Sequence, residues 1–238
     1  MTDSTPNLRE LNKRRTREAI SHAATRLFID RGFERTTIAE VATAAGVAKM
    51  TVTNHFPRKE DLFLDLHEEM VARYARAVAD RAPGESALAA LRRACLAEID
   101  RRDAALGFSG EAFARTITES PALTARLREL HEQGETALAT ALAEAAHVPP
   151  GDFESRVAAG LLAAVPRAVS TEVFRRTLAG EDHEAVAAAV RPSAARAFDR
   201  LEGALGDFAV RADEAGATDE AKETEVTKEA EVVKAIEE

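Results

Sequence analysis

The sequence predicts an all-helical protein, and three observations support this class. Alanine, the best helix former, accounts for 51 of the 238 residues. Tryptophan is absent and tyrosine occurs once, so two of the residues that favour strands are scarce. No stretch alternates β-branched and polar residues between turn dipeptides, which is the pattern of a β-hairpin. We therefore expect helices separated by short turns.

Capping residues and helix breakers place the first two helices. Residues 11–31 have apolar side chains on one face and are followed by Gly32, a common C-terminal stop. The hydroxyl of Thr37 can cap the next helix, and Glu40 three positions later completes a capping box. This second helix is expected to end near residues 45–46.

Prolines and glycines divide the rest of the chain into further helices. Pro57 ends the third helix, and Pro83 stops the fourth. Pro166 and Pro192 fall inside the last two, which we expect them to bend or interrupt. From these features, helices are predicted over residues 49–56, 59–81, 86–106, 111–118, 122–146, 152–178 and 182–205.

The net charge of -9 conceals two oppositely charged parts. Residues 1–59 carry 11 Lys or Arg against 6 Asp or Glu, and residues 60–238 carry 21 against 35. The chain as a whole is therefore not a basic protein that coats nucleic acid. A small basic head could nevertheless bind an anionic polymer, while the acidic body does not contact it. Chance clustering of charge is the alternative.

Other features of the composition restrict the class further. Cys95 is the single cysteine, so it has no partner within the chain for a disulfide and too few neighbours for a metal cluster. This favours a reducing, cytoplasmic compartment. The longest apolar run, 157–165, is too short for a membrane span, and no signal peptide is evident. We expect no cofactor, no metal and no membrane partner.

Residues 36–59 read TTIAEVATAAGVAKMTVTNHFPRK, which has the spacing of a helix-turn-helix. Val41, Val47 and Val52 make its inner face. The side chains left on the outer face of the second helix suit the edges of bases in the major groove of DNA. They are Lys49, Met50, Thr53 and Asn54.

Residues 17–63, REAISHAATRLFIDRGFERTTIAEVATAAGVAKMTVTNHFPRKEDLF, resemble the TetR (AcrR-type) family of bacterial transcriptional regulators. The "GF" turn, the "TT" cap, the "AGV" turn and the "HF" ending recur in the family's order. The resemblance implies an all-helical homodimer that binds palindromic operators in double-stranded DNA. It also implies release from DNA when a small ligand enters the C-terminal domain.

The same resemblance assigns DNA contacts. Base-reading positions fall on the four outer residues named above. Met50 and Thr53 stand where glycine and tyrosine are common in the family, and Ala48 replaces the usual serine cap, which gives up about 1 kcal/mol. Basic residues ahead of the first helix could enter the minor groove or follow phosphates, or they could be a solvated terminus. The expected phosphate contacts are Arg14, Arg15, Arg17, Thr37, Thr51, His55 and Lys59.

We divide the chain into a flexible basic arm (1–14), a DNA-binding domain (15–58), an effector-binding and dimerisation domain (59–207) and a disordered acidic tail (208–238). The helices 152–178 and 182–205 are expected to form the dimer, although a core within one subunit would give the same pattern. The effector is expected to be apolar or acyl-like. Its candidate pocket residues, which could equally be core, are His67, Tyr74, Cys95, Phe108 and Phe113.

Three other functions compete with a repressor. An enzyme is disfavoured, because His67-Glu68-Glu69 and similar pairs do not form His-Glu-x-x-His and no phosphate-binding loop or nucleophile elbow is present. An architectural DNA-binding protein would share the helix-turn-helix but need no effector. Activation instead of repression depends on where the operator lies, so the sequence leaves it open.

Overall fold

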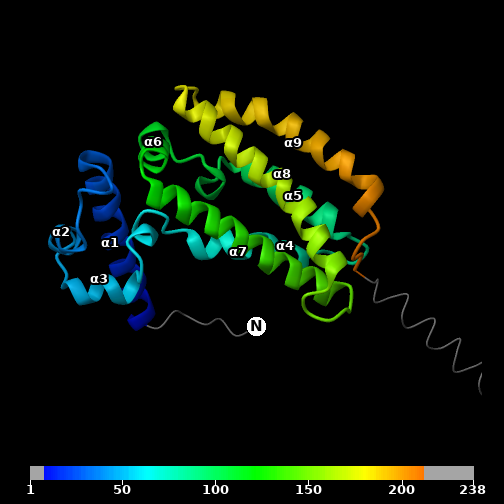
Figure 1. Cartoon of the computed structure of the whole chain (residues 1–238), viewed down its shortest axis with the longest axis horizontal. Helices are drawn as coiled ribbons and strands as arrows, with labels where there is room; N and C mark the ends of the chain where they lie inside the picture. Colours follow the sequence, from blue (N-terminus) through cyan, green and yellow to red (C-terminus); the bar gives the residue numbers. More distant parts are fainter. Residues whose placement is uncertain (1–7, 212–238) are drawn as a thin grey trace, which may run out of the picture.

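The computed structural model describes residues 8–211, and this range contains nine α-helices, two short 3₁₀-helices and no strand (Figure 1). The predicted all-α class is confirmed. The elements are α1 (Leu8–Arg31), α2 (Ile38–Ala44), α3 (Lys49–His55), η1 (Glu60–Leu62), α4 (His67–Ala79), α5 (Ala87–Arg101), η2 (Ala104–Leu106), α6 (Glu111–Glu119), α7 (Pro121–Ala145), α8 (Phe153–Leu178) and α9 (His183–Leu205).

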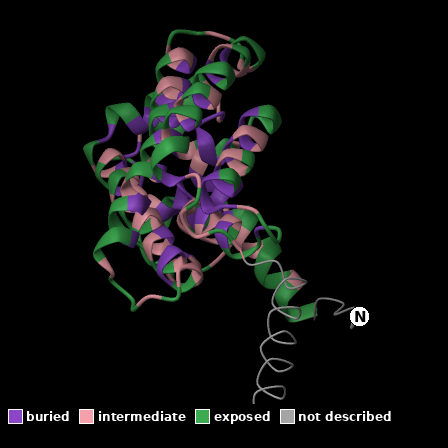
Figure 2. Cartoon of the chain, turned by 90° about the vertical axis from the view of Figure 1, so that its right-hand side faces the viewer, coloured by how far each residue is buried: buried purple, intermediate pink, exposed green. Residues whose placement is uncertain are grey.

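The helices α1–α3 form a head at one end of the molecule, and α4–α9 form the body (Figure 1). In the body, α7 packs between α4 and α8, while α9 packs against α5 and α8. The buried residues lie in the interior between these helices (Figure 2). By length and composition α8 is apolar enough to cross a membrane, but it packs against α7 and α9 as one helix of this bundle.

The core of the head continues into the body. Residues 56–66 form the connecting segment between α3 and α4. The Phe28 ring of α1 packs edge to face on the Phe63 ring of this segment, with 5.8 Å between ring centroids. The Phe63 ring stacks on the Phe113 ring of α6, with 4.1 Å between centroids. One buried cluster joins head residues such as Val52 with Leu123 and others from α6 and α7. The head and the body therefore share a wall of aromatic and aliphatic side chains.

The structure changes two expected boundaries in the first half of the chain. Residues 8–14, expected as part of a flexible arm, are the first turns of α1. The helix expected over 59–81 is split into η1 and α4. Leu62, Phe63 and Leu64 are all buried, and three consecutive side chains cannot all point to one face of a straight helix. The chain therefore turns between the two elements.

Two further expectations concern the body. The helix expected over 86–106 ends at Arg101, because Arg102 adopts a left-handed conformation with φ 54° and Asp103 then caps η2. Pro166 and Pro192 lie inside α8 and α9, neither of which they interrupt.

The end of the described range packs against the body. The backbone N–H of Arg211 donates to the carbonyl of Glu85 at 3.2 Å, and the N–H of Gly84 donates to the carbonyl of Arg211 at 2.9 Å. The Arg81 side chain donates to the carbonyl of Ala209 at 3.1 Å. Residues 208–211, expected in the disordered tail, are therefore part of the fold, and residues 212–238 lie outside the described range.

Candidate nucleic-acid interface and ligand cavity

The helix-turn-helix is built as its sequence predicts. The Thr37 hydroxyl accepts from the backbone N–H of Glu40 at 3.2 Å, and the Thr37 N–H donates to the Glu40 carboxylate at 2.8 Å, so the predicted capping box is confirmed. Gly46 has φ 68° in the turn, a conformation that favours glycine. As expected, Ala48 gives α3 no side-chain cap.

None of the expected base-reading residues on α3 is buried, whereas Val52, which anchors the helix, is fully buried. Lys49, Met50 and Asn54 are exposed, and Met50 is 69% accessible, which is unusual for a large apolar side chain. Thr53 is half-buried, and its hydroxyl donates to the Met50 carbonyl at 3.1 Å. Side chains that extend from α3 into solvent are available to bases in a major groove.

A groove of about 470 Å³ lies where the start of α1 meets the end of α3. Arg14 lines this groove, whereas Arg15 is exposed on α1 and does not line it. Burial and the nearby cations lower the pKa of His55, so its ring is neutral at pH 7. The groove is lined by Glu10, Lys13, Arg14, Arg17, Asn54, His55, Pro57 and Glu68. Thr51, also expected to contact phosphate, is half-buried on α3.

Two of the cations expected at phosphates are engaged within the protein. The Arg17 guanidinium donates to the carbonyls of His55 at 2.8 Å and Asp65 at 3.2 Å, and it stacks 4.2 Å from the Phe56 ring centroid. The Lys59 ammonium donates to the carbonyl of Phe33 at 2.6 Å and lies over the same residue's ring. These contacts fix α3 and the connecting segment to α1.

Ion pairs that the sequence does not reveal join the connecting segment to α7. Arg126 donates to Asp61 at 2.8 Å, and both side chains are buried. Arg58 makes two hydrogen bonds to the carboxylate of Glu129, at 2.7 and 2.9 Å. Asp61 and Arg126 are 65 positions apart, so no local pattern could have revealed the pair.

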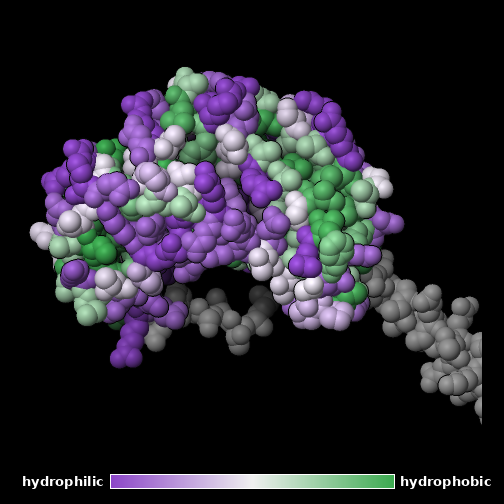
Figure 3. Space-filling model, in the orientation of Figure 1, coloured by the Kyte–Doolittle hydropathy of each residue, from purple (hydrophilic) through white to green (hydrophobic). Residues whose placement is uncertain are grey.

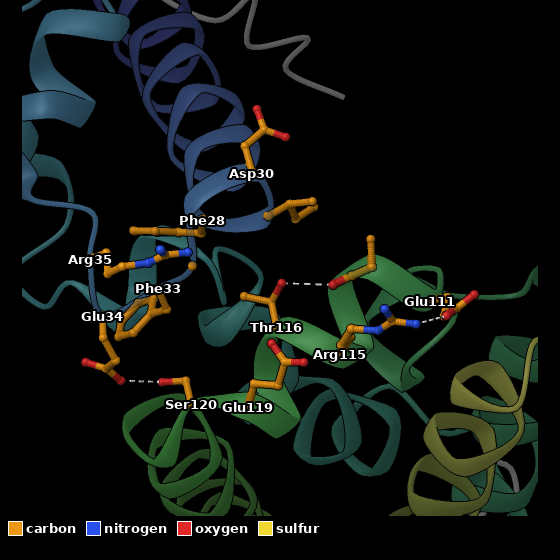
Figure 4. Close-up of a pocket in the computed structure, with 13 residues that line it drawn as sticks. Phe28, Asp30, Phe33, Glu34, Arg35, Glu111, Arg115, Thr116, Glu119 and Ser120 are labelled. Atoms are coloured by element: carbon orange, nitrogen blue, oxygen red, sulfur yellow. Dashed lines mark hydrogen bonds and ion pairs between the residues drawn. The ribbon is translucent and has the colours of Figure 1, made fainter.

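A polar cleft of about 720 Å³ separates the end of α1 from α6 (Figure 4). The Ser120 hydroxyl at the start of α7 donates to Glu34 in the loop after α1 at 2.8 Å and bridges the cleft. Arg115 on α6 pairs with Glu111 of the same helix instead of reaching across. The head and the body therefore meet through few polar contacts on this side.

A mostly apolar cavity of about 310 Å³, partly open to solvent, lies in the body next to the segment that leads from the head. Phe63 and Met70 come from this segment and α4, Phe113 from α6, and Phe174 from α8. Asp65 also lines the cavity, and its carboxylate accepts a hydrogen bond from Ser21 of α1. The volume is at the lower end of the range of small-molecule sites.

The structure brings only one of the five expected pocket residues, Phe113, to this cavity. Tyr74 is buried and donates to Glu98 at 2.8 Å, which places it at a second, smaller cavity. Cys95 lies in the body core, where burial raises the pKa of its thiol to about 12. Phe108 packs edge-on against the ring of His183. His67 Nδ1 donates to the Leu64 carbonyl at 3.0 Å. Phe108 lies in the loop between η2 and α6 and not on a helix as expected. The depth at which each of these residues lies depends on packing against segments that are distant in the sequence.

The predicted dimer helices expose part of their apolar surface. On α8, Phe153, Val157 and Leu161 are 69%, 45% and 43% accessible. A groove of about 310 Å³ between α8 and α9 is lined largely by valine and alanine. Figure 3 shows a hydrophobic area on the part of the body where α8 and α9 lie. Other large apolar side chains of these two helices, such as Leu162 and Phe198, are buried within the subunit core.

A helix-turn-helix head, fixed to a helical body that contains an apolar cavity, defines a DNA-binding transcriptional regulator. Residues 20–66 match the family described as bacterial regulatory proteins, tetR family. The chain is 34% identical over 197 residues to the HTH-type transcriptional regulator TcmR of Streptomyces glaucescens, covering 79% of this chain and 86% of the relative. The protein belongs to the TetR family.

Other comparisons agree with this assignment. The HTH-type transcriptional repressor AcnR of Corynebacterium diphtheriae is 35% identical over 94 residues, which span 40% of this chain and 46% of AcnR. The structure of SmeT in complex with triclosan has a TM-score of 0.52 at 19% identity, covering 82% of this chain and 93% of SmeT. NalD of Pseudomonas aeruginosa has a TM-score of 0.50 at 18% identity, covering 78% and 96%. The two structures support the fold.

Proposed function

We propose that the protein is a cytoplasmic repressor that binds a palindromic operator as a homodimer and leaves it when a small apolar effector binds. The observation that carries this proposal is the position of the cavity. Its wall includes Phe63 and Asp65, and this same segment holds the head through Ser21 and Arg17. A ligand there would bear directly on the orientation of the DNA-reading helix.

For DNA recognition, we propose that Lys49, Met50, Thr53 and Asn54 read bases. Lysine suits guanine and asparagine suits adenine, while the methionine and threonine side chains can contact a thymine methyl. Phosphates are contacted by Arg14 in the groove between α1 and α3, by Arg15, and by polar groups on the helices. These polar groups are Thr37, Thr51 and His55. Arg17 and Lys59 contribute by fixing α3 and the connecting segment, because their hydrogen bonds are directed inward.

The homodimer would form through α8 and α9. Phe153, Val157 and Leu161 are accessible on α8, and pairing with a second subunit would remove them from water. Two heads are needed to read two half-sites about 34 Å apart on one face of the DNA. An effector that favours a different head spacing lowers the operator affinity by its differential affinity for the two arrangements.

Selection of bound DNA from a random pool tests the head and the dimer together. We expect an inverted repeat, and we expect the variant Lys49→Ala/Asn54→Ala to enrich no sequence. Arg76→Ala is the matched control, because Arg76 is an exposed cation on α4 in the body. Enrichment without a repeat, or equal affinity for all sequences, would refute an operator-binding dimer.

The effector role is tested on the selected operator by fluorescence anisotropy. Decan-1-ol serves as a neutral apolar probe, and a thermal shift establishes that it is bound. Ser170→Trp places an indole in the cavity that Ser170 lines, so this variant should bind operator but no longer respond. If bound decan-1-ol leaves the operator affinity of the wild type unchanged, the cavity is not the effector site.

A further inference from the structure

Two cavities lie end to end between the same three helices, α4, α7 and α8. The apolar cavity of about 310 Å³ reaches Leu127 on α7 and Phe174 on α8. The second, of about 30 Å³, lies one to three turns further along the helices, at His131 and Ala163. Met70 lines both and forms the partition between them. Phe174 and Ala163 are 11 residues apart on α8, so the two cavities together span about 16 Å.

A buried cation stands at the small cavity. The side chain of Arg73 is 9% exposed, and among the described residues its Nε and Nη1 have no hydrogen-bond partner. Its nearest anion is the Glu98 carboxylate, 3.5 Å from Nη1. A guanidinium stays charged in a protein, and buried donors without partners are rare in native structures. The guanidinium also lies 4.6 Å from the centroid of the Tyr74 ring, but a ring face satisfies neither of these two donors, which an acceptor in the small cavity would satisfy.

The protonation of the neighbouring groups is compatible with an anionic acceptor at Arg73. Glu98 accepts a hydrogen bond from Tyr74 at 2.8 Å, and burial raises the pKa of its carboxyl, which can take up a proton when another anion approaches Arg73. Burial and two nearby arginines lower the pKa of His131 to about 4, so its ring is neutral. Arg167 Nη1 lies 3.5 Å from Glu135 Oε2, and both side chains are partly exposed to solvent.

We propose that the ligand of this body is an apolar monocarboxylic acid, whose hydrocarbon part fills the larger cavity and whose carboxylate passes Met70 to bind Arg73. The inference rests on the proposed function and names the chemical class of its effector. Methionine suits the partition, because its unbranched side chain changes rotamer easily. The guanidinium suits the head group, because it presents paired donors to a carboxylate.

Calorimetric titration of the full chain with matched probes tests this proposal. Decanoate and decan-1-ol differ in the head group, and 2-naphthoate and 2-naphthalenemethanol repeat the comparison for an aromatic body. In at least one of the two pairs, we expect the acid to have a Kd at least tenfold below that of the matching alcohol. The pair that shows this difference identifies the hydrocarbon part of the ligand as aliphatic or aromatic. Tyr74, the single tyrosine, gives an emission change on decanoate binding that locates the probe.

The variant Arg73→Met/Glu98→Gln removes the buried ion pair as a unit, so that no charge is left unpaired and the fold is retained. In this variant we expect the Kd values of acid and alcohol to agree within about twofold. Arg76→Met, an exposed position on the same helix, is the control and should keep the wild-type preference. A preference that survives in Arg73→Met/Glu98→Gln overturns the proposal, as does equal binding of acid and alcohol by the wild type.

Three further outcomes test the parts of this proposal, and the last two separate it from the proposed function. If formate raises the melting temperature as much as decanoate does, the anion alone is recognised and the apolar part of the proposal is wrong. If decanoate binds through Arg73 without changing operator affinity, the ligand class stands and the effector role fails. If decan-1-ol releases the operator and decanoate binds no better, the effector role stands and the ligand class fails.

Discussion

The buried ion pair between Asp61 and Arg126 makes a quantitative prediction about how the head is held. The two side chains are 5% and 7% exposed and meet at 2.8 Å. Replacing Arg126 by leucine leaves the Asp61 carboxylate buried without its charge partner, which typically costs about 3–5 kcal/mol. The additional contact between Arg126 and Glu129 contributes little, because Glu129 is 40% exposed and solvent screens it. The loss is a large share of the stability of an ordinary domain.

Guanidinium denaturation followed by circular dichroism measures this free energy of unfolding. Arg128→Leu removes an exposed arginine from the same helix and should change the free energy by less than about 0.5 kcal/mol. Asp61→Asn/Arg126→Leu should recover most of the loss, because no buried charge remains. A cost below about 1 kcal/mol for Arg126→Leu, or a double variant no more stable than the single one, would show that water reaches the pair and would refute the reasoning.

Four other predictions concern DNA, capping, assembly and pH. Lys49→Ala should weaken operator binding by about 1–3 kcal/mol and relax one base position, measured by anisotropy; equal losses on scrambled DNA would contradict base reading. Thr37→Ala should lower the free energy of unfolding by about 1 kcal/mol, because it removes the capping box of α2; an unchanged denaturation midpoint would oppose this. Leu161→Glu should give a monomer by light scattering, since it places a charge on the exposed face of α8, and a dimer of undiminished stability would exclude that face. Burial lowers the pKa of His131 in the folded state to about 4 from an ordinary value near 6.5, so the unfolded state binds the proton first. The free energy of unfolding should therefore fall by up to about 3 kcal/mol as the pH drops from 6.5 towards 4. Denaturation at several pH values should show a smaller slope for His131→Gln than for the wild type, and an identical slope would assign the pH dependence to other groups.

The fold class and the local helix signals could be predicted from the sequence because they depend on near neighbours. Thr37 and Glu40 are three positions apart, and the capping box that they form needs nothing from the rest of the chain. The alternation of caps, glycines and prolines likewise placed most helix ends within two residues. The split of the helix expected over 59–81 was missed, because it arises where Leu62, Phe63 and Leu64 all find buried partners.

The candidate site was less accessible to sequence reasoning. The resemblance placed Lys49, Met50 and Asn54 at positions that the structure leaves exposed on α3. It also placed Arg17 and Lys59 at phosphates, although both donate inward to backbone carbonyls that other segments bring near. An amphipathic pattern tells which face of a helix is buried but not whether a cavity lies behind it. Only the packing of α4, α7 and α8 distinguishes a cavity wall from a filled core.

The shared wall of Phe28, Phe63 and Phe113 has a consequence for exchange between related proteins. A head joined to a foreign body at residue 59 would lose its packing partners on α6 and α7, including Leu123. A chimera of that kind would carry a half-exposed core. If α3 reads bases as proposed, we expect exchange of DNA specificity to be easiest through its outward residues, and a transplanted head to need the α6–α7 surface that completes it.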